Sequence, residues 1–500
     1  MPDDLSLSRP LATAQRLGDL APDRHRFHQK PVLLTGEQKV LSTENGVECL
    51  LTSLRLLVRV TSQLTVSIPD GLDDLRRDCR TLSDHITFGN GIVEFGKAAD
   101  LNHYDAILCV GSKSRPELPW TVINSQGWLA RVSSGPIHLP SDCTQTNPIA
   151  AMAAAALGVS EVFKRLLKLK ESRARVLNGL AFSLESYRCG EVHAGLPLPK
   201  DMRANLLLAG VGAIGNGIVH LLGRLPITGT AWVVDAQKYR QENLGTCILI
   251  GPHDIGSPKA IFAADALGKR FQAIGFPEEI AQFRDRLGRD VPYPGIVLNG
   301  LDNVDARNEV QGIWPDLLLD GAIGDFPCQV SRHRWGEDSA CLSCLFRQTE
   351  GESAEQVQSR STGLSITRVR QFDDLVTEDD VQSTAPDKQG WLRKRIGRQV
   401  CSVVREGVAQ QLSEEKQRGD FQPSVPFVAC MSASLVVAEL VKFIAGWPTA
   451  LETRFQFDLL RGPEIGQMFP QNRRHDCDCV ARAENIEKWR KSRALAISCP

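Results

Sequence analysis

The apolar positions of the chain form short continuous runs that alternate with longer stretches of helical period. From Asn205 to Lys259, an apolar run over 206–209 enters a glycine-containing turn, an apolar-periodic stretch follows, and a second apolar run ends at Asp235. Short apolar runs separated by helical segments are typical of the buried strands of a parallel sheet. This stretch therefore predicts strand, turn, helix and strand, which is the repeating unit of an α/β fold.

A similar alternation precedes this stretch, between residues 31 and 190. Apolar periodicity predicts two helices, over 47–58 and 147–170, with Pro148 suited to the first turn of the second one. Apolar runs predict three strands, over 64–69, 104–113 and 127–134. We therefore expect a second α/β domain in this part of the chain.

The two domains resemble each other in sequence. The residues around Gly111 parallel those around Gly300, which sets Lys113 against Asp302. The pair Glu161 and Lys164 likewise parallels Glu439 and Lys442. An internal repeat of this size indicates two related domains in one chain. An unrelated α/β domain over 31–190 is the alternative.

An insert distinguishes the second domain from the first. The interval from Gly300 to Glu439 is far longer than the interval from Gly111 to Glu161, and the extra length lies over 346–425. Its first part, 347–363, is polar and is predicted to form a mobile crossover loop. Its second part, 390–413, has a helical pattern and contains Cys401.

Cys401 is the candidate nucleophile of the chain. Three arginines, Arg395, Arg398 and Arg405, lie near it in the sequence. Positive neighbours lower the pKa of a thiol and increase the fraction of reactive thiolate. The alternative is a packed cysteine between two valines of a helix. Two rival cysteines lie in apolar stretches where core packing explains them, Cys328 and Cys430.

Composition narrows the class of protein. The chain has 500 residues, of which 42% are hydrophobic and 23% charged, so an ordinary globular protein of about three units is expected. A net charge of −1 argues against a nucleic-acid partner, which needs a basic surface. We expect no membrane span and no signal peptide. The 14 scattered cysteines favour a reducing cytoplasm over a disulfide scaffold.

The glycine turn carries the first candidate chemistry. Gly210, Gly212 and Gly215 form G-x-G-x-x-G between a strand and a helix, where the backbone can approach a phosphate at the helix N-terminus. Asp235 follows about twenty residues later, at the place of an acid that binds a ribose hydroxyl. This pattern alone is typical of a nicotinamide-dependent dehydrogenase, and it also occurs in any tight strand-to-helix turn.

Three later residues favour a different chemistry. Asn243 follows the ribose acid, Lys259 lies in the sequence GSPK, and Asp302 comes directly after another apolar run. A dehydrogenase does not need a lysine and an aspartate at these places. A nucleotidyl transferase uses a lysine for the phosphates and an acid for Mg²⁺.

Together these residues resemble the ThiF/MoeB family and the adenylation domain of ubiquitin-activating enzymes. The resemblance implies that the three glycines form the ATP loop, that Asp235 binds the ribose, and that Asp302 binds Mg²⁺. It also implies that Asn243 and Lys259 face the phosphates. The family usually has Asn-Leu-x-Arg, whereas this chain has Thr246 in place of the arginine. Arg240 is a candidate substitute.

The resemblance implies a fold class of tandem Rossmann-like adenylation domains with a helical, cysteine-bearing insert. The first copy lacks the glycine motif and the magnesium acid, so it is expected to be inactive. Relatives often reach an N-terminal arginine to the partner's nucleotide, which makes Arg24 and Arg26 candidates. The expected units are an N-terminal segment 1–30, the inactive domain 31–190, the active domain 200–345 and 426–480, the insert 346–425, and a charged helical tail 481–500.

Two cysteine pairs suggest a metal site. Cys341 and Cys344 form C-x-x-C, and Cys477 and Cys479 form C-x-C. Members of the family often hold structural Zn²⁺ with four cysteines at these two places. The second pair is one residue short of the usual spacing, so His475 is an alternative ligand. A redox pair and four unligated cysteines are the other interpretations.

The resemblance implies ATP-dependent activation of the C-terminal tail of a ubiquitin-like protein. Adenylation would be followed by thioester formation on Cys401 and transfer to a conjugating-enzyme-like acceptor. A one-chain tandem resembles activating enzymes of bacterial ubiquitin-like conjugation operons, including antiviral defence systems. The alternatives are an adenylyltransferase for a sulfur carrier, which would need no large insert, and a degenerate binding scaffold, which the Thr246 departure supports.

Overall fold

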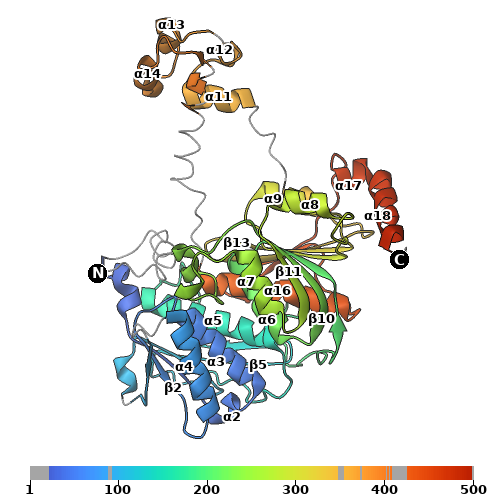
Figure 1. The fold of residues 1–500 in the computed structure, drawn as a ribbon. Helices are drawn as coiled ribbons and strands as arrows, with labels where there is room; N and C mark the ends of the chain where they lie inside the picture. Colours follow the sequence, from blue (N-terminus) through green and yellow to red (C-terminus); the bar gives the residue numbers. More distant parts are fainter. Residues whose placement is uncertain are drawn as a thin grey trace. The chain divides into compact units, whose positions relative to one another are not determined.

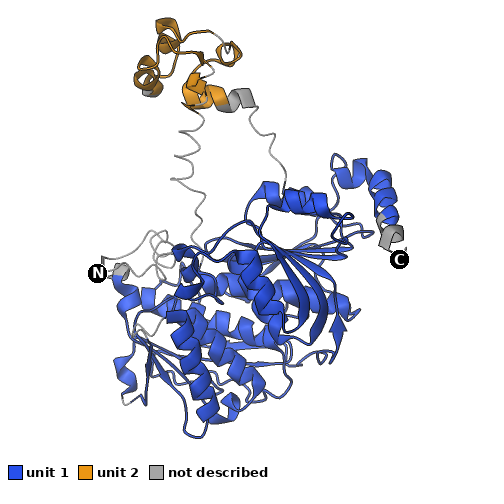
Figure 2. Ribbon diagram, in the orientation of Figure 1, with its two compact units in different colours: residues 1–346, 423–500 blue, residues 347–422 orange. Residues whose placement is uncertain are grey.

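A computed structural model describes residues 22–87, 93–98, 100–346, 354–371, 374–400, 402–404, 406–407 and 425–497. The chain divides into two compact units, one made of residues up to 346 and from 423 onward, and the other of residues 347–422 (Figure 2). Each unit is described by itself.

The first half of the larger unit contains a seven-stranded sheet in the order β3-β2-β1-β4-β5-β6-β7. The first five strands of this order are mutually parallel, and the last two pairings are antiparallel. The strands are β1 (Val32–Gly36), β2 (Leu64–Ser67), β3 (Val93–Phe95), β4 (Ala106–Val110), β5 (Trp120–Gln126), β6 (Leu129–Ser133) and β7 (Leu180–Ser183). The helices are α3 (Glu44–Leu57), α4 (Asp73–Thr87) and α5 (Pro148–Leu167), with the short α2 (Gln38–Leu41) before them.

The second half contains a nine-stranded sheet, whose main order is β11-β10-β9-β12-β13-β14-β15-β16, with β8 paired to β10. Its strands are β8 (Met202–Arg203), β9 (Leu206–Ala209), β10 (Ile227–Val234), β11 (Phe271–Phe276), β12 (Ile296–Asn299), β13 (Leu317–Ile323), β14 (Pro327–Arg334), β15 (Arg454–Asp458) and β16 (Gln467–Phe469). Its main helices are α6 (Ala213–Arg224), α7 (Lys259–Leu267), α8 (Ile280–Arg286), α9 (Val304–Gln311) and α16 (Pro426–Ile444).

The two sheets repeat one topology. Strands β1 to β7 correspond, in chain order and in sheet order, to β9 to β15, and parallel neighbours match parallel neighbours throughout. Helix α3 corresponds to α6, and α5 corresponds to α16. The fold class predicted from the sequence, a tandem of Rossmann-like α/β domains, is confirmed.

Helices α5 and α16 form the layer between the two halves (Figure 1). Helix α5 packs on β5 and β6, α16 packs on β13 and β14, and the two helices pack on each other. Helix α16 is long and apolar enough to cross a membrane, but 89% of its most apolar stretch of 18 residues is buried inside the protein. It is therefore a core helix. Each helix buries one acid–lysine pair, Glu161 with Lys164 and Glu439 with Lys442.

The smaller unit is helical around its own core. It contains α11 (Ala354–Thr362), α12 (Ile366–Val369), α13 (Glu378–Gln382) and α14 (Pro386–Arg393). The core residues are Leu364, Val369, Val376, Val381, Leu392, Val400, Val403 and Val404. This cluster is separate from the clusters of the larger unit, so burial of its own apolar side chains favours folding of the insert.

Two predictions about the insert are wrong in detail. The polar stretch expected as a loop contains α11, because Thr362 at its end is buried against Gly407 and Trp391 lies beside the same glycine. The stretch over 390–413, whose pattern is helical, is interrupted after Arg393, because Gly397 adopts φ +81°, and helical residues resume at Val400.

Candidate active site

Three parallel strands end at the same edge of the second sheet. Ala209 of β9 is directly opposite Val234 of β10 on one side and Asn299 of β12 on the other. The residues that follow these strand ends are Gly210, Asp235 and Gly300. Adjacent strands are about 4.8 Å apart, so the backbone gathers the predicted glycine loop and the predicted ribose acid at one place.

The glycines of the loop have different structural reasons. Gly210 adopts φ +84°, which favours glycine. A Cβ on Gly215 would lie 2.2 Å from the Gly210 carbonyl oxygen, so this helix residue must lack a side chain for the turn to close. A Cβ on Gly212 would meet no described atom within 4 Å. Gly212 is the N-cap of α6 and offers no side-chain cap, so open space lies beside free N–H groups of the helix.

Asp235 ties the glycine loop to the next strand. Its carboxylate accepts a hydrogen bond from the Val211 N–H at 2.7 Å and from the Gln237 N–H at 2.8 Å. The side chain is almost buried, with 8% of the residue exposed. These contacts give Asp235 a role in positioning the loop, and the ribose contact expected from the sequence stays a prediction.

Lys259 begins α7 and points to the same segment. Its Nζ donates to Gln237 Oε1 at 2.7 Å and lies 5.9 Å from the ring centre of Tyr239. Its backbone N–H donates to the Gln237 carbonyl at 2.9 Å. The lysine is 5% exposed and makes no ion pair with a described carboxylate. Its charge is therefore held in place without being neutralised, which suits a phosphate ligand.

Asn243 lies in the short 3₁₀ helix η3 (Gln241–Gly245), where its Oδ1 accepts from the Arg240 N–H at 2.8 Å. This bond fixes the asparagine and leaves its amide N–H groups available. Thr246, at the place of the family arginine, is 1% exposed and so cannot present its hydroxyl at the surface. The Arg240 side chain is 75% exposed, 3.9 Å from Glu242.

Asp302 follows the end of β12 in the loop before α9. It is exposed, and in the described part of the chain it has no hydrogen-bond or ion-pair partner. The next residue, Asn303, caps α9 by accepting from the Ala306 N–H at 2.7 Å. A free carboxylate oxygen is a fitting ligand for Mg²⁺, and the magnesium role stays a prediction.

A buried acid that the sequence reasoning missed lies behind this loop. Asp320 of β13 is fully buried, and its Oδ1 accepts from Asn299 Nδ2 at 2.6 Å and lies 3.6 Å from Arg307 Nε. Its Oδ2 has no partner among the described atoms. Burial raises the pKa of Asp320 to about 6, although Arg307 and Asn299 oppose the rise. An aspartate inside the apolar run LLLDG was the available signal.

The equivalent place in the first half is filled by the protein itself. After β1, the side chain of Glu37 accepts from the Lys113 N–H at 2.8 Å and from Ser112 Oγ at 2.8 Å. A Cβ on Gly111 would lie 2.7 Å from the carboxylate carbon of Glu37. The carboxylate thus sits against the loop that corresponds to 300–302 of the second half.

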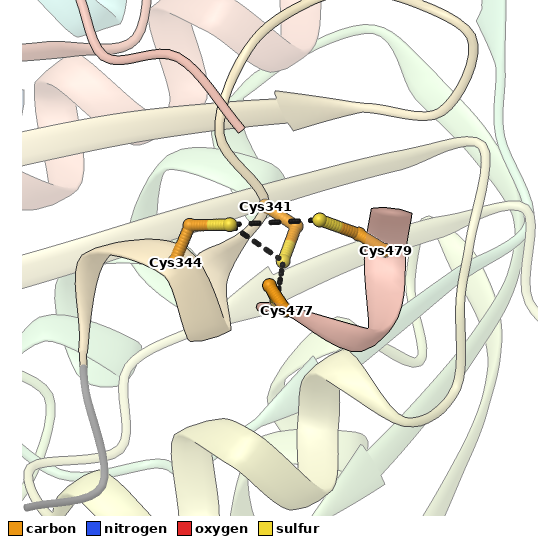
Figure 3. Close-up of side chains that lie close together, drawn as sticks. All are labelled: Cys341, Cys344, Cys477 and Cys479. Carbon is orange, nitrogen blue, oxygen red and sulfur yellow. Dashed lines mark hydrogen bonds between the residues drawn. The ribbon is translucent and has the colours of Figure 1, made fainter. Parts of the chain in front are cut away.

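The two predicted cysteine pairs come together, as Figure 3 shows. Cys341 and Cys344 come from the start of α10 (Leu342–Leu345), and Cys477 and Cys479 from the start of α17 (Asp478–Ala481). Their sulfur atoms all lie within 4.8 Å of one another. Neighbouring sulfurs are 3.5 to 3.7 Å apart.

These separations fit a metal site better than a disulfide. Four sulfurs about 2.3 Å from a tetrahedral Zn²⁺ are about 3.8 Å from one another, whereas a disulfide requires about 2.05 Å. The cluster could therefore hold zinc. His475 is exposed and lies outside the cluster, so Cys479 occupies the fourth place and the alternative histidine ligand is not supported.

Cys401 and Arg405 lie outside the described residues. The two other arginines invoked beside Cys401 have a carboxylate partner: Arg395 and Arg398 pair with Glu406 at 2.6 and 2.8 Å. Their expected effect on a thiol is therefore reduced.

The rival cysteines of the larger unit are buried. Burial raises the pKa of Cys430 to about 12 and that of Cys328 well above its usual value. Neither thiol is poised for nucleophilic attack. In the N-terminal segment, Arg26 is exposed on the 3₁₀ helix η1 (Pro22–Gln29), and the side chain of Arg24 lies outside the described residues.

Comparisons with known proteins give matches over both halves of the chain. Residues 31–178 match the BilD N-terminal domain. An uncharacterized protein of Sinorhizobium fredii, y4jF, is 26% identical over 89% of this chain and 87% of its own length. The bacterial E1-like protein BilD of a Collimonas species is 25% identical over 72% of this chain and 76% of its own length.

Two further matches are shorter. A sulfur carrier protein adenylyltransferase of Thermus thermophilus is 28% identical over 29% of this chain and 56% of its own length. The crystal structure of E. coli MccB shares 15% identity with a TM-score of 0.37, covering 55% of this chain and 65% of that chain. The ThiF family model matches residues 200–480, more than half of the chain, and the protein therefore belongs to the ThiF family.

Proposed function

We propose that this protein is an E1-like enzyme that uses ATP to activate the C-terminal carboxylate of a ubiquitin-like protein. One observation carries the proposal: the free N-terminus of α6, the unneutralised Lys259 at the start of α7 and the unpartnered Asp302 all follow the carboxyl ends of neighbouring strands of one sheet. Open N–H groups, a cation and a free carboxylate form a set of groups that suits a nucleoside triphosphate with its divalent cation.

In the proposed reaction, a carboxylate oxygen of the carrier attacks the α-phosphorus of ATP. A new bond forms between that oxygen and phosphorus, the bond to the bridging oxygen breaks, and pyrophosphate leaves with the electron pair. The N–H groups of α6 and the ammonium of Lys259 stabilise the phosphate charge, and Asn243 donates to it. Asp302 would hold Mg²⁺, which when bound neutralises phosphate charge.

The second proposed step uses Cys401. Its thiolate attacks the carbonyl carbon of the acyl-adenylate, and AMP leaves as the thioester forms. The carrier then passes to the thiol of a conjugating-enzyme-like acceptor. Support for this step comes from the position of Cys401 in the insert and from the relative described as an E1-like protein.

We assign the first half a non-catalytic role, because the Glu37 carboxylate is bound to the loop after β4, which corresponds to the loop after β12. Structural Zn²⁺ in the four-cysteine cluster and a cytoplasmic location belong to the same proposal. A sulfur-carrier adenylyltransferase is the second candidate, since one shorter relative carries that description. Such an enzyme would form the adenylate without the thioester on Cys401.

The test is a reaction of the full chain with ATP, Mg²⁺ and a ubiquitin-like protein encoded beside it, followed by non-reducing gels and intact mass. Wild type is compared with Cys401→Ala and Asp302→Ala. Matched controls are Cys189→Ala, at a partly exposed cysteine of the first half, and Asp305→Ala, at an exposed acid of α9.

A thiol-sensitive adduct that is lost in Cys401→Ala and Asp302→Ala but kept in both controls supports activation with thioester transfer. Pyrophosphate release without an adduct in wild type would select the sulfur-carrier function. Tight binding of the carrier with neither product would select a scaffold.

A further inference from the structure

A segment of the second half is held by side chains of the first half. Arg59 Nη2 donates to the carbonyl oxygens of Cys247 and Ile250, both at 2.9 Å. Arg55 Nη1 donates to the carbonyl of Ile248 at 3.1 Å. His85 Nε2 lies 3.2 Å from the carbonyl of Leu249. Four successive carbonyls, over 247–250, therefore have partners from α3, from the turn that follows it, and from α4. We call this segment the clamped segment.

The clamped segment needs these partners. It lies between η3 and the 3₁₀ helix η4 (Pro252–Asp254) and belongs to no strand or helix. A buried carbonyl without a partner costs stability, and a segment outside helices and strands lacks their regular backbone partners. The contact is also close, since a Cβ on Gly251 would lie 2.0 Å from the His85 carbonyl.

Both arginines stay cationic in this interface. Arg59 is 2% exposed. Burial lowers the pKa of Arg55 and of Arg59 to about 10, which still leaves both guanidinium groups protonated at neutral pH. A charged donor makes a stronger bond to a carbonyl than a neutral donor does.

The clamped segment is connected to the nucleotide loop by side-chain hydrogen bonds. The Leu249 N–H donates to Asn216 Oδ1 at 3.2 Å, and Asn216 is fully buried in α6. Asn216 Nδ2 donates to the Val211 carbonyl at 3.2 Å and to the Tyr239 hydroxyl at 2.8 Å. Val211 belongs to the glycine loop that Asp235 also holds, and Tyr239 lies under Lys259.

We propose that Arg55 and Arg59 are positioning residues for the nucleotide site, so that the site in the second half is complete only while these two arginines of the first half clamp residues 247–250. This inference rests on the proposed function, since it assumes that the glycine loop binds ATP. The first half then completes the nucleotide site as well as supporting the fold.

The experiment measures ATP binding, in the presence of Mg²⁺, by calorimetry on the full chain. Arg59→Ala removes both hydrogen bonds from this side chain to the clamped segment. Arg59→Lys keeps the positive charge but lacks the planar, fixed arrangement of N–H donors of a guanidinium group. Arg165→Ala is the matched control, because Arg165 also donates to two carbonyls, those of Trp120 and Ser134, but both lie within the first half. His85→Ala tests the clamp at a position whose side chain is 43% exposed.

We expect Arg59→Ala to weaken ATP binding by about tenfold or more, with Arg59→Lys intermediate. Amide hydrogen exchange over the clamped segment should rise in Arg59→Ala, whereas Arg165→Ala should lower thermal stability and leave ATP affinity within about twofold. His85→Ala, which leaves the core intact, should show a smaller loss of affinity in the same direction.

Wild-type ATP affinity in folded Arg59→Ala, or in His85→Ala if Arg59→Ala does not fold, would overturn the inference. An equal loss in Arg165→Ala would reduce the effect to general stability and would overturn it too. Absence of ATP binding by wild type would instead contradict the proposed function, so the two failures are distinguishable.

Discussion

Gly212 and Gly215 belong to one loop but have different surroundings. Substitutions at the two positions should therefore affect nucleotide binding and protein stability separately. A Cβ on Gly215 would press on the Gly210 carbonyl, whereas a Cβ on Gly212 would enter the open space at the start of α6. We expect Gly215→Ala to lower the free energy of unfolding by about 2 kcal/mol or more. Gly212→Ala should change it by less than about 0.5 kcal/mol and yet weaken ATP binding.

Urea denaturation and calorimetry with ATP measure the two effects separately. Equal ATP affinity in Gly212→Ala and wild type would show that the open space at the α6 N-terminus is not where the nucleotide binds.

Asp320 should make stability depend on pH. Burial raises the pKa of its carboxyl in the folded protein to about 6, above the value of about 4 in the unfolded chain. The folded state therefore holds the proton more tightly. The resulting cost is absent below about pH 4, grows as the pH rises, and is complete above about pH 6, where it amounts to roughly 2 to 3 kcal/mol.

Asp320→Asn removes this titration and keeps an oxygen for Asn299. The free energy of unfolding of the variant minus that of wild type, from urea denaturation, should increase between about pH 4 and pH 6 and stay constant above. A difference independent of pH would show that the carboxyl has the same pKa in the folded and unfolded chains.

Single residues also show what the sequence could and could not predict. Gly210 and Asp235 can be predicted to lie together because strand ends and the glycine turn are visible in the sequence, whereas Lys259 is expected near them only from the family resemblance. The burial of Thr246 and the pairing of Arg395 with Glu406 were not foreseen, because both depend on contacts between segments that no local pattern specifies.

At the scale of elements, the two short helices α10 and α17 should form one zinc site. We expect one Zn²⁺ per chain by elemental analysis, with X-ray absorption showing four sulfurs at about 2.3 Å. Cys477→Ser should lose the metal and unfold at lower temperature, since structural zinc contributes several kcal/mol to folding.

The control for that prediction is Cys189→Ser, at a partly exposed cysteine of the first half that lies outside the cluster. Retention of zinc and of wild-type thermal stability in Cys477→Ser would contradict a structural metal site.

Element types were predicted better than element boundaries in the insert. The helices α5 and α16 and strands such as β4 and β12 follow apolar patterns that tertiary packing reinforces. The insert is polar over much of its length, so its helices depend on a small separate core that the pattern did not show. Gly397, in a left-handed conformation, ended a helix that periodicity alone extended.

At the scale of the whole chain, the repeated topology raises the question of how many nucleotides bind. In the first half, the carboxylate of Glu37 lies against the loop that corresponds to 300–302 of the second half, and its negative charge would repel a phosphate there. We expect calorimetry to give one ATP per chain. Gly212→Ala should weaken that single event, and Glu37→Ala should leave its affinity unchanged.

A stoichiometry of two nucleotides per chain would contradict the non-catalytic role of the first half. The tandem itself could be predicted, because the Glu–Lys pairs of α5 and α16 repeat in the sequence. The contribution of Glu37 could not be predicted from the sequence, because its partners Ser112 and Lys113 follow a strand that is distant in the chain.

The cysteine cluster links two stretches of chain on either side of the insert, with Cys344 before it and Cys477 after it. With a metal bound, the polypeptide between them is a closed ring. Closing a ring of more than a hundred residues lowers the conformational entropy of the unfolded chain, which stabilises the folded state by on the order of 4 kcal/mol. A protease that cuts once within 347–422 would open this ring, and the metal would still hold the two resulting fragments together. The nicked protein should then migrate as a single particle under native conditions and as two fragments after a chelator and a denaturant are added.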